Sequence, residues 1–205
     1  MPAPVHSSSQ SRYLLMIRLP RTTEVRIEDR FLPSVGATRP PMGYHISIVG
    51  PFYWASDNVE PSLSRTNSAC AQASPLALRI RGVDVFENAP DDCGVFLHVG
   101  PVRPLRALRE RLLAALGEAI TPQYHRVGPY RPHVTIGLNL PSRVGQALLQ
   151  SGKQPFRARF AADEVWLMEQ RPQSPWRPLL AFCLGSAANG SERAPRRLDV
   201  EHIDG

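Results

Sequence analysis

Apolar and polar residues form blocks along the chain that predict a mixed domain of strands and helices. Tyr13–Leu19 is a compact apolar run typical of a buried strand. We expect a helix over about residues 24–33, followed by a loop rich in Pro and Gly from Pro33 to Gly43. The next β-type run, His45–Val49, stops at a Gly-Pro pair.

The middle of the chain repeats this order. Residues 76–86 alternate as a strand, and residues 94–99 pair back on them as a hairpin. A helix is predicted at 104–118, because leucines recur there at helical spacing. These leucines are Leu105, Leu108, Leu112, Leu113 and Leu116. A second loop rich in Pro and Gly then leads into His133–Ile136.

The remaining segments complete one domain. We expect a weak helix at 59–74, a short helix near 142–150, and strands over about 156–170 and 176–185. Residues 1–11 are predicted to be a disordered lead-in and residues 187–205 a flexible tail, because neither segment has an apolar face. Residues 12–186 then form a single bilobal domain.

The two halves share one order of strand, helix, loop and a strand that opens with histidine. Two such units pair most naturally as lobes related by a pseudo-twofold axis, with the histidine strands facing a shared cleft. The histidine strands read Gly-Tyr-His-Ile-Ser-Ile and Arg-Pro-His-Val-Thr-Ile. A third His-x-Ser match, His6-Ser7-Ser8, lies in the predicted lead-in and is discounted.

Strand alternation places His45 with Ser47, and His133 with Thr135, on one face of each strand. Two imidazoles suit phosphodiester chemistry without a metal, because one removes a proton from the attacking group while the other protonates the leaving oxygen. The hydroxyls can donate to non-bridging phosphate oxygens. We expect a backbone carbonyl to hold each imidazole in one tautomer. The structural alternative is two ordinary strand histidines with solvated neighbours.

The excess of arginine in the composition is consistent with a partner that carries phosphate. The chain has 205 residues with 24 basic and 18 acidic side chains, and Lys153 is its only lysine. Arginine matches phosphate oxygens with a planar fork. GC-rich codon usage would also raise Arg, Ala and Pro together, so charge alone does not decide between the two explanations.

The cysteines and the hydropathy pattern limit the cellular location and the kinds of structural support that we expect. Cys70, Cys93 and Cys183 form no CxxC pair, which argues against a disulfide scaffold and a zinc ribbon. No apolar run approaches the roughly 20 residues of a membrane span. We therefore expect a cytoplasmic monomer with no membrane association, no metal and no cofactor.

These motifs resemble the 2H phosphoesterase superfamily, which includes the bacterial 2'-5' RNA ligase and cyclic phosphodiesterase group. The resemblance extends to the opening strand Tyr13–Pro20, to the Pro-Phe that follows the first motif, and to Tyr130–Ile136. It implies an α+β, bilobal, LigT-like duplicated fold, with two antiparallel-rich sheets and flanking helices around a central cleft.

The resemblance also implies roles. His45 corresponds to the proton donor and His133 to the proton acceptor, with Ser47 and Thr135 as phosphate-binding residues, and the donor and acceptor exchange with reaction direction. The substrate would be a 2',3'-cyclic phosphate or a 2'-5' linkage of RNA or nucleotides. The RNA ligase group usually carries an arginine soon after the second motif, whereas Gly137-Leu-Asn follows here, which leaves the substrate open.

Three further residues near the motifs are candidates for substrate contact. They are Trp54, as a stacking platform for a base, Tyr130, and Arg131, for which solvation is the alternative. Tyr44, which precedes His45, is expected to pack inside the lobe. The predicted function is a metal-independent hydrolase of a cyclic or 2'-5' phosphodiester. The alternatives are RNA ligation by the reverse reaction, a non-catalytic binder of nucleotides or RNA ends, and a metal-dependent hydrolase.

Overall fold

The computed structural model describes residues 10–36, 38–89, 91–123, 129–150, 156–189 and 193–198. The predicted lead-in up to residue 9 and the end of the predicted tail lie outside these ranges. The strands are β1 (Arg12–Arg18), β2 (His45–Trp54), β3 (Leu76–Ala89), β4 (Asp92–Gly100), β5 (Ile120–Pro122), β6 (His133–Pro141), β7 (Arg157–Ala162), β8 (Glu164–Gln170), β9 (Trp176–Cys183) and β10 (Arg196–Arg197). The helices are α1 (Arg21–Val35), α2 (Glu60–Ala71), α3 (Val102–Leu116) and α4 (Ser142–Gln150).

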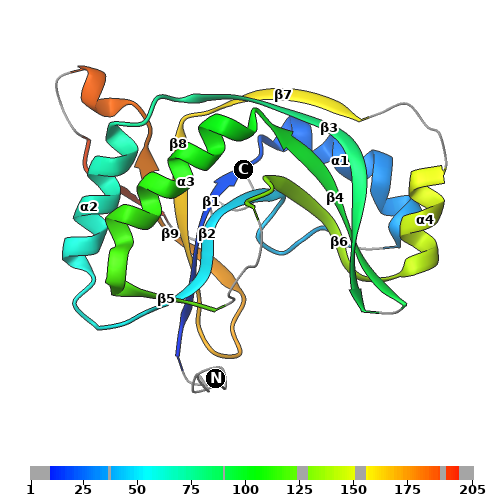
Figure 1. The fold of residues 1–205 in the computed structure, drawn as a ribbon, viewed down its shortest axis with the longest axis horizontal. Helices are drawn as coiled ribbons and strands as arrows, with labels where there is room; N and C mark the ends of the chain where they lie inside the picture. Colours follow the sequence, from blue (N-terminus) through cyan, green and yellow to red (C-terminus); the bar gives the residue numbers. More distant parts are fainter. Residues whose placement is uncertain are drawn as a thin grey trace.

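All strand pairs are antiparallel, and they fall into two halves. The strand order is β10-β9-β8-β1-β2 in the first half and β6-β4-β3-β7 in the second, with β5 beside β2. The halves meet where β2 pairs with β6, at Ile46 and Val134 (Figure 1). The expected α+β fold is confirmed, and its two antiparallel sheets are joined into one path by the two strands that carry the histidine motifs.

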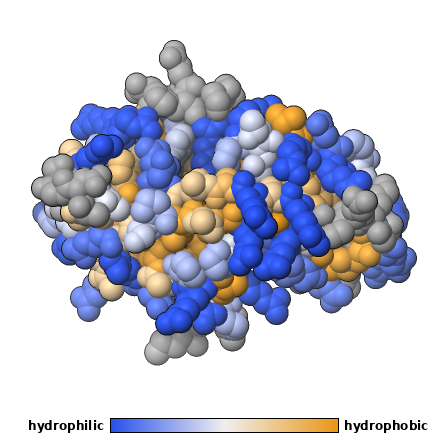
Figure 2. Space-filling view, turned by 90° about the horizontal axis from the view of Figure 1, so that it is seen from above, coloured by the Kyte–Doolittle hydropathy of each residue, from blue (hydrophilic) through white to orange (hydrophobic). Residues whose placement is uncertain are grey.

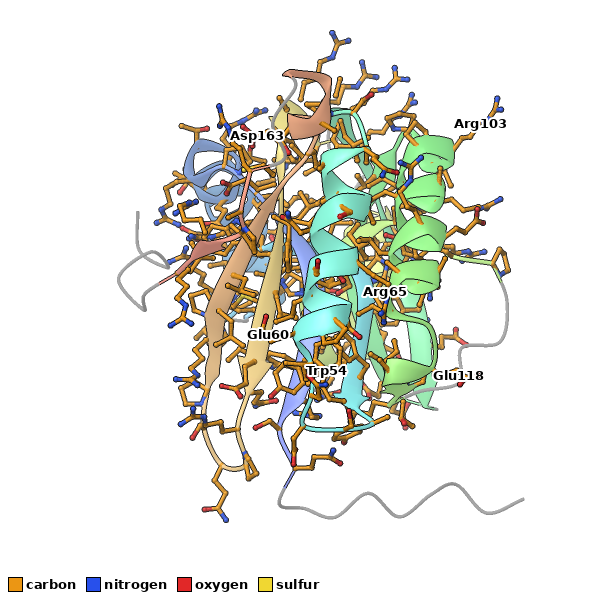
Figure 3. The ribbon with its side chains drawn as sticks, turned by 90° about the vertical axis from the view of Figure 1, so that its left-hand side faces the viewer. Trp54, Glu60, Arg65, Arg103, Glu118 and Asp163 are labelled. Carbon is orange, nitrogen blue, oxygen red and sulfur yellow. The ribbon has the colours of Figure 1, made fainter. Side chains whose placement is uncertain are left out.

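The repeat predicted from the sequence is present as β1-α1-β2 and β4-α3-β6. Each repeat helix packs mainly on the opposite half: α1 contacts β6 of the second half, and α3 contacts β2 of the first half more extensively than its own β4. The other two helices complete these layers, with α2 against β9 and α4 against β3 and β4. Figure 1 therefore shows α2 and α3 on one side and α1 and α4 on the other, and Figure 3 shows α2 and α3 side by side over the first half.

The helix faces predicted to be apolar form the core. On α3, four leucines of the predicted stripe, Leu105, Leu108, Leu112 and Leu116, are fully buried. They join one large apolar cluster with the inward residues of the strands. Within the described ranges, no helix is both long and apolar enough to cross a membrane.

The segment predicted as one strand over 156–170 is divided at Asp163. Its first part, β7, pairs with β3 at the edge of the second half, and its second part, β8, pairs with β1 in the first half. β7 alternates between exposed and buried residues, whereas β8 is buried on both faces over residues 165–169. This change of pattern coincides with the break at Asp163, but it does not specify the new partner strand.

The predicted flexible tail differs from the structure over residues 196–198. Arg196 and Arg197 pair with β9 as the edge strand β10. Leu198, 6% exposed, then packs in a second apolar cluster. The other buried members of this cluster are Leu14, Met16, Trp166, Met168 and Ala181.

We expect truncation after Pro195 to lower the free energy of unfolding by about 2 kcal/mol, the usual contribution of one buried leucine side chain. Truncation after Leu198 keeps the buried leucine and β10, and should cost much less. Urea denaturation of the two shortened proteins and the full chain measures the difference. Equal stability of all three proteins would show that this segment contributes nothing to the fold.

Candidate active site

The two histidine motifs lie on neighbouring strands because their apolar residues are buried together. Ile46 and Val134 are Cα partners across β2 and β6, and both side chains are completely buried. Alternation along each strand turns the flanking residues to the other face. His45, Ser47, His133 and Thr135 are accordingly all partly exposed. The structure thus brings together the four residues selected from the sequence.

The antiparallel register defines how these four side chains face one another. Pairing centred on Ile46 and Val134 sets His45 across from Thr135, and Ser47 across from His133. Each histidine therefore has a hydroxyl opposite it, and the two imidazoles lie on a diagonal. Such diagonal positions on neighbouring strands are about 7–8 Å apart.

Both imidazoles are held in the same tautomer by backbone carbonyls, as expected. Nδ1 of His45 donates to the Gly43 carbonyl at 3.1 Å, and Nδ1 of His133 donates to the Arg131 carbonyl at 2.7 Å. Because a carbonyl oxygen only accepts, each Nδ1 carries a hydrogen, and Nε2 is the ring nitrogen that could exchange a proton. Both carbonyls belong to the residue two positions before the histidine.

The two histidines have different surroundings. Burial lowers the pKa of His45, and the nearby charge of His133 lowers it further, while the hydrogen bond to Gly43 and the charge of Glu24 partly oppose these effects. His45 is therefore neutral near pH 7 in the free protein. The ring of His133 packs edge-on against Phe96 and Phe86, with centroid distances of 5.3 and 6.0 Å.

A buried carboxylate on α1 supports the backbone at His45. Glu24 is fully buried, accepts a hydrogen bond from the Tyr44 N–H at 2.8 Å and forms an ion pair with Arg39 at 2.7 Å. Gly43 has φ +71°, and a Cβ there would lie 2.6 Å from Oε1 of Glu24. The turn that presents the Gly43 carbonyl to His45 thus requires glycine. Sequence analysis missed Glu24, since an acidic residue in an amphipathic helix usually faces solvent.

Tyr44 packs inside the lobe, as predicted. Its side chain is completely buried beside α1. Burial, together with the negative charges of Glu28 and Glu24, raises the pKa of Tyr44 to about 12. Tyr44 therefore stays neutral and takes no part in proton exchange at the motif.

Two of the predicted contact residues, Tyr130 and Arg131, position the site and also line a hollow beside it. The Tyr130 hydroxyl donates to the Ser47 carbonyl at 2.9 Å, and the Arg109 guanidinium lies over the Tyr130 ring at 5.2 Å. Tyr130 thereby ties the loop before β6 to β2. Arg131 supplies the carbonyl that orients His133, while its side chain is exposed beside the site.

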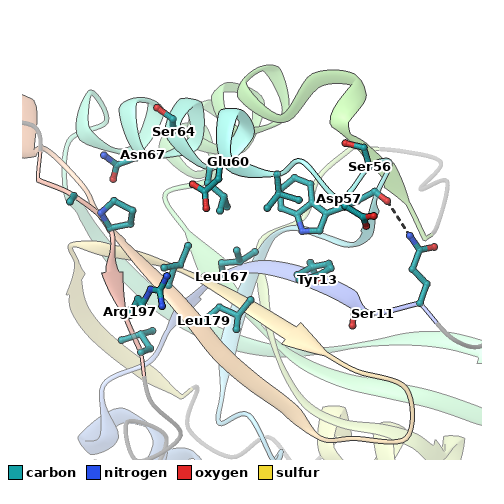
Figure 4. Close-up of a pocket in the computed structure, with 18 residues that line it drawn as sticks. Ser11, Tyr13, Ser56, Asp57, Glu60, Ser64, Asn67, Leu167, Leu179 and Arg197 are labelled. Atoms are coloured by element: carbon teal, nitrogen blue, oxygen red, sulfur yellow. Dashed lines mark hydrogen bonds between the residues drawn. The ribbon is translucent and has the colours of Figure 1, made fainter.

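The structure places Trp54 away from the two histidines, and its predicted stacking on a base stays a prediction. Its ring packs against Tyr13 and Phe52, which belong to the core between the strands and the helices. There it lines a hollow of about 1010 Å³ beneath α2, together with residues such as Glu60 and Leu167 (Figure 4). This hollow is lined by neither histidine.

Arg18 is a site residue that the sequence analysis missed. It is the Cα partner of His45 on β1, so it lies on the same face of the sheet. Its guanidinium lies over the Trp166 ring at 5.1 Å. The available signal was an arginine ending the first apolar run, but its pairing with His45 depends on a register between distant segments. Among the described residues, no group of three or more His, Cys, Asp or Glu could hold a metal ion.

The fold and the paired motifs define a duplicated two-histidine domain, the class formed by the 2H phosphoesterases. A family model described as the 2'-5' RNA ligase superfamily matches residues 21–173. The chain therefore belongs to the 2'-5' RNA ligase superfamily, and the resemblance noted in the sequence is confirmed. This membership supports an enzyme of the phosphodiesterase or ligase kind.

Solved structures agree with this fold. TT0787 of Thermus thermophilus is 21% identical with a TM-score of 0.59, over 85% of this chain and 98% of that chain. E. coli LigT complexed with NADP+ is 19% identical with a TM-score of 0.59, over 86% and 99% of the two chains. Usb1 of Kluyveromyces marxianus is 15% identical with a TM-score of 0.52, over 86% and 99%. No curated protein matches the chain.

We expect Glu24→Ala to destabilise the protein by about 1–3 kcal/mol, because the buried Tyr44 N–H loses its acceptor. Glu24→Gln retains an oxygen for this N–H and should cost less. Glu28→Ala is the matched control, since Glu28 pairs with the same arginines but is partly exposed. Urea denaturation measures all three. Equal losses for Glu24→Ala and Glu28→Ala would contradict a supporting role of Glu24 at the motif.

Proposed function

We propose that the protein is a metal-independent phosphodiesterase that acts on a 2',3'-cyclic phosphate or a 2'-5' linkage of RNA or nucleotides. The observation that carries this proposal is the matched pair of imidazoles, each with Nδ1 bound to a carbonyl and Nε2 left to exchange a proton. A nucleotide substrate is supported by E. coli LigT, a structural neighbour that is complexed with 3'-AMP, ATP and NADP+. A cytoplasmic monomer remains a prediction.

In the proposed reaction, His133 accepts a proton from water as the water oxygen bonds to phosphorus. The bond from phosphorus to one ribose oxygen breaks, and that oxygen takes the proton from Nε2 of His45. One water is consumed, and the two imidazoles return to their starting states by proton exchange with solvent. In the ligation direction the two roles exchange, because the same proton transfers run backwards.

Ser47 and Thr135 would bind the phosphate during this reaction. Their hydroxyls have no hydrogen-bond partner within the described part of the chain, and both lie on the face that carries the imidazoles. Each can therefore donate to a non-bridging phosphate oxygen, where negative charge grows in the transition state. Arg18, beside His45, adds positive charge at the same place.

We expect His45→Ala and His133→Ala each to lower turnover by about a hundredfold or more, the usual scale of general acid–base catalysis. The assay uses 2',3'-cyclic nucleotides, an RNA ending in a cyclic phosphate and a 2'-5'-linked dinucleotide, with and without EDTA. Trp54→Ala is the control, because Trp54 lines the separate hollow beneath α2.

EDTA should leave this turnover unchanged. Turnover that EDTA abolishes and zinc restores would contradict a metal-independent mechanism. Ligation of RNA ends without hydrolysis would favour the reverse reaction. Tight binding of these ligands without turnover would favour a binding protein.

The pH dependence tests the role of His45. In His133→Ala, where His45 alone remains to exchange protons, a proton-donating His45 must be protonated, so the residual activity falls as pH rises through the pKa of His45. Burial lowers this pKa in the free protein, so in kcat/KM this alkaline limb should lie below pH 6.5, the ordinary histidine pKa. The negative charge of bound substrate raises the pKa, so in kcat the limb should move to higher pH. Activity that instead falls as pH drops through this value would make His45 the acceptor.

A further inference from the structure

Four arginines gather on two edge strands of the second half. Arg79 and Arg81 lie on β3, and Arg157 and Arg159 lie on β7, where all four side chains are exposed. The register pairs Arg79 with Arg159 and Arg81 with Arg157 as direct Cα partners. We call these residues the arginine quartet.

Electrostatic repulsion within the quartet destabilises the protein when no ligand is bound. Like charges directly opposite each other on a sheet are destabilising. Other arginines of the protein are neutralised, such as Arg39 by Glu24 and Arg196 by Glu164. Within the described ranges, no guanidinium of the quartet forms an ion pair or a side-chain hydrogen bond. An anionic ligand would provide the missing counter-charge.

The quartet lies on the same face of the sheet as the candidate active site. His98 on β4 is the Cα partner of His133 on one side and of Arg81 on the other. His133, His98, Arg81 and Arg157 thus form a row across four neighbouring strands. At about 4.8 Å between strands, this row extends roughly 14 Å from His133.

The surface along this row is hollowed. A hollow of about 540 Å³ is lined by the quartet and His98. A second hollow of about 480 Å³ shares Arg81 and His98 with it and continues to Arg106 and Arg131. The carboxylate in this second hollow belongs to Asp84, which forms a hydrogen bond with Nε2 of His98 at 3.1 Å. Figure 2 looks onto the upper side of Figure 1, along which β3 and β7 run, and shows hydrophilic side chains lying across apolar ones.

We propose that the arginine quartet binds the phosphate backbone of a single-stranded RNA whose reacting phosphodiester lies between His45 and His133. This inference rests on the proposed function and names the substrate class as an oligoribonucleotide. A free cyclic nucleotide places its single phosphate at the histidines and does not reach the quartet. In a longer chain, the phosphates preceding the reacting group follow the row from His98 to Arg81 and Arg157. Guanidinium groups hold such phosphates with two parallel hydrogen bonds.

The binding test uses a fluorescently labelled ten-nucleotide RNA and fluorescence anisotropy over a series of salt concentrations. The logarithm of the binding constant falls with the logarithm of salt by about 0.7 for each phosphate contact on a single strand. Arg157→Gln/Arg159→Gln should therefore weaken binding and make the slope shallower by about 1.4, for two lost contacts. Arg79→Gln/Arg81→Gln should act alike. Arg103→Gln/Arg111→Gln, on the exposed face of α3, is the matched control and should not change the slope.

Turnover gives a second, independent readout. The ratio of kcat/KM for an RNA ending in a cyclic phosphate to kcat/KM for a 2',3'-cyclic mononucleotide should fall roughly tenfold in each quartet variant, the scale of two lost exposed ionic contacts. The control variant should keep the ratio of the unmodified protein. Melting temperatures of the quartet variants should not fall, because each variant removes one arginine from both opposed pairs and so ends both like-charge contacts.

The outcomes separate the two proposals. If cyclic phosphates are hydrolysed but the quartet variants bind RNA with an unchanged salt slope, the quartet assignment is wrong and the proposed function stands. If RNA binds through the quartet but no phosphodiester reacts, the proposed function fails and the quartet assignment stands. Polyglutamate of equal charge that displaces the RNA equally well would make this face a docking surface for acidic protein, and would overturn the assignment.

Discussion

The burial of Ile46 against Val134 is the contact on which the candidate active site depends. Each residue lies between a histidine and a hydroxyl residue, so burying it turns both neighbours to the opposite face. Pairing the two strands at this point then brings both motifs onto one surface. A slip of one residue in either strand would bury a polar motif and expose an apolar one. The apolar residues of the motifs therefore specify the site as firmly as the histidines do.

The sequence predicted the parts of the site that follow from local periodicity. The repeat, the two motif strands and the shared face of His45 and Ser47 all follow from alternation within a few residues. Glu24 and Arg18 could not be found in this way, because their contacts join segments whose register is set by tertiary packing. Trp54 is near the first motif along the chain, but it lies seven residues beyond Ser47 and packs on the opposite face. Edge strands such as β10 were missed because two paired residues leave almost no pattern.

The two halves share a backbone plan but have diverged in chemistry. In the first half, the face beside the motif is largely covered by the apolar cluster around Met16 and Trp166, and His45 is the more buried histidine. In the second half, aromatic rings hold His133, and the face beyond it is open and strongly basic. A site built from two equivalent strands thus has two unequal surroundings, which would suit the opposite proton-transfer roles proposed for the two imidazoles.

The packing of α1 and α3 on each other's halves has a consequence for the origin of this architecture. A single strand-helix-strand repeat covers little of its own sheet, because its helix packs mainly against the neighbouring half. Taken alone, such a repeat would leave an apolar sheet face exposed to water, and a second copy that exchanged helices with it would cover that face. The chain therefore has the form of a domain-swapped dimer whose two subunits have become one polypeptide. In such an ancestor, the symmetry axis would have passed between two identical histidine strands.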